Sequence, residues 1–213
     1  MTKRIFITAT NTDIGKTYVT THLLKHYAEL GHRVGVIKPI ETGVEQSPPD
    51  GSSLLTLVQE LNPLMKDLSI NDLVPIQFRL PAAPYCANNA EPIDLTVVDK
   101  AIEKIEARCD ILIIEGAGGL YVPIDKNTMI IDLIKRFEAK ALLVSHCRLG
   151  CINDTILSIK ALQERSYDFE WTLNCHDDDY SFATVSEPYF RDQYPDFTRF
   201  SRDIATIAQT LLL

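Results

Sequence analysis

The chain has 213 residues, of which 46% are hydrophobic and 23% are charged, and its formal net charge is −8. This length suits one domain spanning residues 1–213, and this composition is that of an ordinary globular protein with its own core. The acidic balance argues against a nucleic-acid-binding protein, which needs a basic surface to meet phosphates. A small anionic ligand remains compatible with it, because backbone N–H groups bind anions locally.

The first apolar run, residues 5–7, is too short for a signal peptide or a membrane span, and a polar segment follows it. We therefore expect a cytoplasmic protein with no membrane attachment. The five cysteines include no CxxC pair, so neither a disulfide framework nor a zinc ribbon is predicted. Cys147 and Cys151 lie near His146, but their spacing is not that of a structural zinc site, and we interpret them as reduced thiols near a strand end.

Short runs typical of strands alternate with segments of helical period. In chain order we predict a strand at 4–8, a helix at 15–30, a strand at 33–38, a helix capped by Asp94 and continuing to 105, strands at 111–114 and 141–145, a helix at 152–165, a strand at 171–174 and a helix at 202–213. Residues 43–53 and 79–92 are predicted loops that can cover a substrate, and 176–200 has no clear period.

This alternation predicts an α/β fold with a mostly parallel, twisted sheet flanked by helices. The carboxyl ends of parallel strands share one edge, and ligands bind there. The loops that follow the five predicted strands should therefore meet at one site.

A phosphate-binding loop is predicted between the first strand and the first helix, which is the context that a Walker A loop requires. The loop reads Ala9-Thr10-Asn11-Thr12-Asp13-Ile14-Gly15-Lys16-Thr17. Its backbone N–H groups and the helix dipole form an anion cradle, in which Lys16 neutralises phosphate oxygens and Thr17 binds Mg²⁺. The alternative is a chance Gly-Lys-Thr at a helix start, and Thr10 stands where a glycine is usual.

Three further segments follow predicted strands at the same edge. Glu115 ends a buried strand and precedes four small residues, which favours a second Mg²⁺ contact over a solvated glutamate. Lys38 also ends a strand, where its ammonium either stabilises phosphoryl transfer or is a plain surface charge. Asn174 follows the last strand and has donors and an acceptor suited to a nucleotide base.

The fourth segment lies between a predicted strand and a helix. Its backbone N–H groups either bind a carboxylate or only begin the helix. The residues concerned are Gly150, Cys151, Ile152 and Asn153.

Together these motifs resemble the dethiobiotin synthetase family, ATP-dependent enzymes that close the ureido ring in biotin synthesis. The family's Gly-Thr-Asp-Thr-x-Val-Gly-Lys-Thr loop is similar to residues 9–17. Its Lys-Pro-x-x-(Ser/Thr)-Gly, Glu-Gly-Ala-Gly-Gly and Gly-Cys-Ile-Asn segments match residues 38–43, 115–119 and 150–153. The order and separations also fit, over about the first 175 residues.

The resemblance implies a P-loop NTPase-like fold and a magnesium-dependent cyclo-ligase. One amine of 7,8-diaminopelargonic acid takes up CO₂, supplied with bicarbonate, as a carbamate that attacks the γ-phosphate of ATP. The second amine then closes on the carbamic-phosphoric anhydride and expels phosphate. The substrate carboxylate would rest on residues 150–153 of a partner subunit, which implies a homodimer.

The resemblance also implies residue roles. Lys16 and Lys38 would stabilise the carbamate and the transferring phosphoryl group, and Thr12 and Thr42 would line the reacting end. The implied magnesium ligands are Thr17, Asp50 and Glu115. The implied nucleotide contacts are Asn11, Thr12, Asp13, Ile14, Gly15, Lys16, Thr17, Tyr18, Glu115, Gly118 and Asn174.

Two departures from the family pattern concern the nucleotide. Ala9 replaces the family's glycine, which we expect to tighten or distort the cradle and weaken nucleotide binding. The family's Gly-x-(Ile/Leu)-Pro-Trp segment, which helps to enclose the base, is not found after Asn174. The choice between ATP and other nucleoside triphosphates therefore stays open.

Three other classes of protein fit the sequence less well. Amidoligases of the cobyric-acid type carry an additional glutaminase domain, for which 213 residues leave no room. A partitioning-type ATPase switch that acts on a protein partner has a signature lysine early in its phosphate loop, and none stands between Ala9 and Gly15. A binding-only protein would not need Glu115 and Lys38 at the strand ends.

Overall fold

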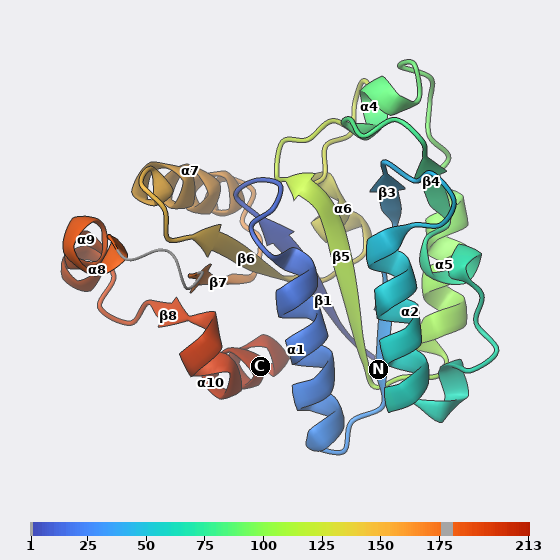
Figure 1. The fold of residues 1–213 in the computed structure, drawn as a ribbon, viewed down its shortest axis with the longest axis horizontal. Helices are drawn as coiled ribbons and strands as arrows, with labels where there is room; N and C mark the ends of the chain where they lie inside the picture. Colours follow the sequence, from blue (N-terminus) through green and yellow to red (C-terminus); the bar gives the residue numbers. More distant parts are fainter. Residues whose placement is uncertain (1, 176–180) are drawn as a thin grey trace.

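The computed structural model describes residues 2–175 and 181–213 and has a six-stranded sheet at its centre (Figure 1). The strand order is β2-β5-β1-β6-β7-β8, and each of the five neighbouring pairs is parallel. The strands are β1 Lys3–Ala9, β2 Val34–Ile37, β5 Ile111–Gly119, β6 Lys140–His146, β7 Phe169–Asn174 and β8 Thr198–Arg199. The predicted α/β class with a mostly parallel sheet is confirmed.

Longer helices cover the sheet. They are α1 Lys16–Glu29, α2 Pro49–Leu61, α5 Thr96–Glu106, α7 Cys151–Glu164 and α10 Phe200–Leu212. In Figure 1, α1, α2 and α10 lie in front of the sheet and α6 (Asp132–Arg136) lies behind it. The Tyr27 hydroxyl donates to the Ala208 carbonyl at 2.8 Å and so joins α1 to α10. None of the described helices is long and apolar enough to cross a membrane.

The core follows from the apolar strands. β1, β5 and β6 are covered on both faces, and residues such as Ile5, Phe6, Ile113 and Leu142 are fully buried. Continuous apolar runs of this kind are what a parallel strand between two helical layers requires. In Figure 1 the carboxyl end of β5 points to the top and that of β6 points to the left.

A small second sheet lies beside the first. It pairs β3 (Ile40–Thr42) with β4 (Ile76–Phe78) in parallel. The predicted loop at 43–53 was too long, because α2 already begins at Pro49 and buries Leu54 and Val58. The predicted loop at 79–92 contains the short helix α4 (Pro84–Ala87), and α3 (Ile70–Leu73) and a 3₁₀ turn (Pro63–Met65) connect α2 to β4.

Other boundaries also differ from the prediction. β5 continues past residue 114 to Gly119, because a register shift lets Gly119 pair with Ala9 of β1. In the aperiodic stretch the structure forms α8 (Phe182–Val185), α9 (Glu187–Gln193) and β8, and α10 begins at Phe200 rather than 202. Residues 176–180 lie outside the described part of the chain.

A disulfide joins Cys147 to Cys175, so the interpretation of Cys147 as a reduced thiol was wrong. The cause is the pairing of β6 with β7, in which His146 stands opposite Asn174. The next residue of each strand therefore faces the other, with a Cα–Cα distance of 5.0 Å that suits a disulfide. The two cysteines are 28 residues apart in sequence, so no local pattern indicates the bond.

Candidate functional site

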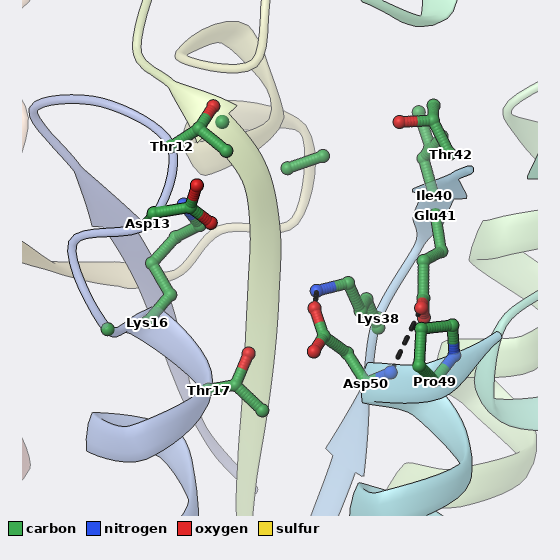
Figure 2. Close-up of a pocket in the computed structure, with 13 residues that line it drawn as sticks. Thr12, Asp13, Lys16, Thr17, Lys38, Ile40, Glu41, Thr42, Pro49 and Asp50 are labelled. Atoms are coloured by element: carbon green, nitrogen blue, oxygen red, sulfur yellow. Dashed lines mark hydrogen bonds and ion pairs between the residues drawn. The ribbon is translucent and has the colours of Figure 1, made fainter. Parts of the chain in front are cut away.

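A pocket of about 270 Å³ opens at the carboxyl edge of the sheet. Side chains of the phosphate loop and α1 form one wall, and those of β3 and the start of α2 form the opposite wall (Figure 2). The lining residues are Thr12, Asp13, Gly15, Lys16, Thr17, Lys38, Ile40, Glu41, Thr42, Pro49, Asp50, Ala117 and Gly118. The structure thus brings half of the predicted site residues to this pocket.

Gly15 gives the phosphate loop its shape. Its φ of +93° is in the left-handed region that glycine adopts without strain. A Cβ atom there would lie 2.3 Å from Asn174 Nδ2, which itself donates to the Ile14 carbonyl at 2.8 Å. The end of β7 therefore contacts the loop directly. The Ile14 side chain is buried.

Lys16 begins α1 and is buried against the loop, where its Nζ donates to the Asn11 carbonyl at 3.3 Å. Burial lowers the pKa of Lys16 to about 8, although the negative charge of Glu115 opposes the shift. A phosphate group in the cradle would favour the charged ammonium. Lys16 is therefore a buried cation that is positioned to bind an anionic ligand.

Glu115 lies at the centre of the site and is 0% exposed. Its Oε1 accepts the Thr17 hydroxyl at 2.8 Å and the Lys38 ammonium at 2.7 Å. Its Oε2 is buried and has no hydrogen-bond partner among the described residues. The alternative of a solvated glutamate is thus excluded, and a buried oxygen remains for a ligand.

Lys38 bridges two acidic side chains of the site, Glu115 and Asp50. It is 5% exposed, and its Nζ also lies 2.6 Å from Asp50 Oδ2. Burial alone would lower the pKa of Lys38, but the combined influence of Glu115 and Asp50 outweighs burial and raises it. Lys38 is therefore a buried ammonium and not a surface charge.

The oxygen atoms around Lys38 fit a magnesium ion. Thr17 offers a hydroxyl, Asp50 a carboxylate, and Glu115 the buried oxygen without a partner. In the described part of the chain no three His, Cys, Asp or Glu side chains gather into a metal-binding group. One or two carboxylates with substrate phosphates and water are, however, the ligand set that Mg²⁺ uses.

Glu41 is a site residue that the sequence patterns do not predict. It is 4% exposed, and its carboxylate accepts the Asp50 N–H at 3.0 Å and the Gly51 N–H at 2.9 Å. Burial raises the pKa of Glu41, although the charge of Lys38 and the two hydrogen bonds from backbone N–H groups act to lower it. The sequence could have indicated a missing cap, because the helix begins at Pro49 and no capping side chain stands before it. It does not indicate which distant residue supplies the cap.

A second pocket, of about 360 Å³, adjoins the first and shares Thr12, Thr42, Ala117 and Gly118 with it. Its remaining wall is apolar and comes mainly from the segment before α4. These lining residues are Pro81, Ala82, Ala83, Pro84 and Val122. An aliphatic chain can lie here with one end beside the phosphate loop.

Some predicted residues lie apart from both pockets. Residues 150–153 begin α7, where Gly150 has a φ of +100° and Cys151 is buried, and they line neither pocket of the same chain. Tyr18 also lies outside them and packs on His22, with ring centroids 4.0 Å apart. Asn11 lines a separate, more open pocket with Thr10 and Tyr121.

Comparison with known proteins gives close relatives. A family model described as an AAA domain matches residues 3–174. An ATP-dependent dethiobiotin synthetase BioD of Sulfurovum sp. is 44% identical over 191 residues, which are 90% of this chain and 91% of that protein. A protein of the same name from Wolinella succinogenes is 36% identical over 213 residues, covering 99% of this chain and 98% of that protein.

Solved structures show the fold. MinD cell division protein of Aquifex aeolicus has a TM-score of 0.51 at 17% identity, covering 97% of this chain and 86% of that chain. A ParA family ATPase from Chlorobium tepidum has a TM-score of 0.53 at 13% identity, with 99% and 91% covered. At such identities the likeness concerns the fold alone and gives no support to a partitioning switch. The relatives above decide the family: the chain belongs to the ATP-dependent dethiobiotin synthetases, within the AAA-domain family that matches residues 3–174.

Proposed function

We propose that this enzyme forms dethiobiotin from 7,8-diaminopelargonic acid, CO₂ and ATP in biotin biosynthesis. The observation that carries the proposal is the cluster of Lys16, Thr17, Lys38, Asp50 and Glu115 at the phosphate loop. It supplies two cations for anionic reactants and oxygen ligands for a metal. A protein that only bound nucleotide would not need a buried ammonium between two carboxylates.

The triphosphate lies in the cradle of the phosphate loop, with Lys16 at the β- and γ-phosphates. Thr17, Asp50 and Glu115 would hold Mg²⁺, which neutralises phosphate charge when bound. Because Lys38 already contacts both carboxylates, its ammonium lies beside the same phosphate. Asn174 contacts the loop and is proposed to read the base.

The reaction needs charge stabilisation more than proton transfer. A carbamate oxygen of the substrate attacks the γ-phosphorus, and ADP leaves. The second amine then attacks the carbamate carbon, and the C–O bond to phosphate breaks to release inorganic phosphate. Lys16 and Lys38 stabilise the negative oxygens in both steps, because preorganised cations in a buried site cost no reorganisation during reaction.

The diamine is proposed to lie in the second pocket. Its aliphatic chain fits the apolar wall of residues 81–84, and its two amines reach Thr12 and Thr42. Since residues 150–153 line neither pocket of their own chain, we propose that they receive the substrate carboxylate of a second copy in a homodimer. A cytoplasmic location, with no attachment to membrane or nucleic acid, is part of the proposal.

The test is a dethiobiotin assay with purified protein, Mg²⁺, bicarbonate, diaminopelargonate and each of several nucleoside triphosphates. We expect product that depends on all components and is lost in Lys16→Ala. The same series settles which base the enzyme prefers. Absence of dethiobiotin with every nucleotide would refute the proposed reaction, and full turnover by Lys16→Ala would refute the role of the phosphate loop.

A further inference from the structure

Glu41 lies beside the proposed magnesium ligands, although none of the motifs includes its side chain. It stands in β3 between Ile40 and Thr42, and Figure 2 shows it turned toward the start of α2. Its Oε1 accepts the Asp50 N–H at 3.0 Å, and its Oε2 accepts the Gly51 N–H at 2.9 Å. Each carboxylate oxygen therefore has a backbone partner, and Glu41 acts on the backbone of its neighbours.

The start of α2 depends on this carboxylate. Its first residue, Pro49, has no N–H, and Pro48 before it provides no side-chain hydrogen bond. The free N–H groups of Asp50 and Gly51 are those that an N-cap side chain normally binds. Glu41 takes this role from another element, with its negative charge at the positive end of the helix dipole.

Gly51 lets the carboxylate come close. A Cβ atom at this position would lie 2.2 Å from Val74 Cγ2 and 3.2 Å from Glu41 Oε2. The first of these distances is too short for any side chain, so the close packing at this joint, where β3 meets the first turn of α2, requires glycine at position 51. β3 and the first turn of α2 are thus fixed to each other through Glu41.

The joint determines where Asp50 lies. The side chain of Asp50 is 46% exposed, and among the described residues its carboxylate accepts a hydrogen bond from Lys38 at 2.6 Å. Its position therefore depends largely on the backbone that Glu41 holds. Lys38 in turn contacts Glu115, so a shift of α2 would move Asp50 away from the other proposed metal ligands.

We infer that Glu41 is a positioning residue that sets the affinity of the site for its divalent cation, by capping α2 and holding the Asp50 carboxylate opposite Glu115. The inference rests on the proposed function in one respect, the assignment of Asp50 as a metal ligand. Residues that orient metal ligands in this way commonly change metal affinity by about 10–100-fold when they are replaced.

The test uses Glu41→Gln, which keeps the shape of the side chain. The amide NH₂ of glutamine faces a backbone N–H at one of the two positions, so one hydrogen bond and the charge are lost. The probe is Mn²⁺, whose free concentration is followed by electron paramagnetic resonance in the presence of a non-hydrolysable ATP analogue. We expect a Kd for Mn²⁺ about 10–100-fold higher than that of the wild type. Glu41→Asp, which is too short to reach both amides, should raise the Kd as well.

Asp94→Ala is the matched control. It removes the exposed hydrogen bonds at the start of α5, where Asp94 Oδ1 accepts the Thr96 N–H at 2.9 Å and the Thr96 hydroxyl at 2.7 Å. We expect it to lower the melting temperature at least as much as Glu41→Gln does, with an unchanged Kd for Mn²⁺. Unchanged Mn²⁺ binding in both Glu41 variants would reduce Glu41 to an ordinary helix cap and overturn the inference.

A double-variant cycle tests whether Glu41 acts through Asp50. In an Asp50→Asn background, Glu41→Gln should weaken Mn²⁺ binding no further, whereas independent losses that multiply would overturn the inference. The binding measurement requires no turnover, so it separates the two proposals. If the variants show this pattern of Mn²⁺ binding while the wild-type protein forms no dethiobiotin, only the proposed reaction is refuted.

Discussion

Replacing Lys38 with methionine removes the ammonium that joins two carboxylates and keeps a side chain of similar length. In the wild type, Lys38 Nζ lies 2.7 Å from Glu115 Oε1 and 2.6 Å from Asp50 Oδ2. Although burial disfavours a charged lysine, the two carboxylates together raise the pKa of Lys38. The variant therefore leaves the Glu115 carboxylate, which is 0% exposed, without its cation.

The structure gives the expected size of the effect. Removing one partner of a buried ion pair costs about 3–5 kcal/mol, because the other charge stays buried. The contact with Asp50 adds at most about 1 kcal/mol, since that carboxylate is half exposed and screened by solvent. We expect the free energy of unfolding to fall by about 4 kcal/mol in metal-free buffer. Mg²⁺ should restore part of it, because a bound dication stabilises the folded state and neutralises the same carboxylates.

The assay is urea unfolding followed by circular dichroism, with EDTA or with Mg²⁺. A raised pKa means that the contribution of Lys38 is fully present below the ordinary lysine value of 10.5 and is lost only as the pH rises through the higher folded value. The deficit should therefore be the same at pH 7 and pH 9. Lys104→Met is the control, because its ion pair with Asp72 is exposed and is worth about 1 kcal/mol or less. A Lys38→Met protein that loses no more stability than this control would refute the reasoning.

Three further predictions concern the phosphate loop and the cysteines. Because burial lowers the pKa of Lys16 to about 8, its charged form costs stability below pH 8, and the cost fades between pH 8 and 10.5. The free energy of unfolding of Lys16→Met should therefore be roughly 3 kcal/mol higher than that of the wild type at pH 7, and this difference should shrink toward pH 10.5. ATP binding measured by calorimetry should be lost. A variant that is less stable than the wild type at pH 7 would contradict this. Gly15→Ala should weaken ATP binding by at least about tenfold, because the variant has backbone strain of about 1–2 kcal/mol and a clash with Asn174. A normal affinity for ATP would argue against the described loop. Thiol titration of the unreduced, urea-unfolded protein should give three reactive thiols out of five, and reduction should lower the free energy of unfolding by about 3 kcal/mol; five thiols before reduction would exclude the Cys147–Cys175 bond.

The parts of the fold that the sequence predicts are those written in local patterns. The apolar runs at residues 5–7 and 111–114 indicate buried parallel strands, and the loop around Gly15 indicates a phosphate cradle because strand, loop and helix follow one another directly. Lys38 and Glu115 were expected at the same edge from strand ends alone. The structure adds that they touch, at 2.7 Å.

The features that the sequence does not predict depend on contacts between distant segments. The cap of α2 comes from Glu41, ten residues before Gly51, and the disulfide depends on the register of β6 and β7. The small β3–β4 sheet was missed because three-residue strands carry too little periodicity to be seen. The sequence predicts a loop at the start of α2 because Pro48, Pro49 and Gly51 are usual in turns, whereas in the structure they begin a helix.

The separate β3–β4 sheet has a mechanical consequence for the pocket. The wall formed by the phosphate loop grows from the six-stranded sheet, but the facing wall belongs to a different hydrogen-bonded unit. The gap between the two walls can therefore widen or narrow without breaking a single strand-to-strand ladder. The walls are joined by the packing of α1 on α2 and by the Lys38 ammonium, which reaches from the end of β2 to the first turn of α2. When reactants enter, they compete for the same charged groups that keep the two halves together.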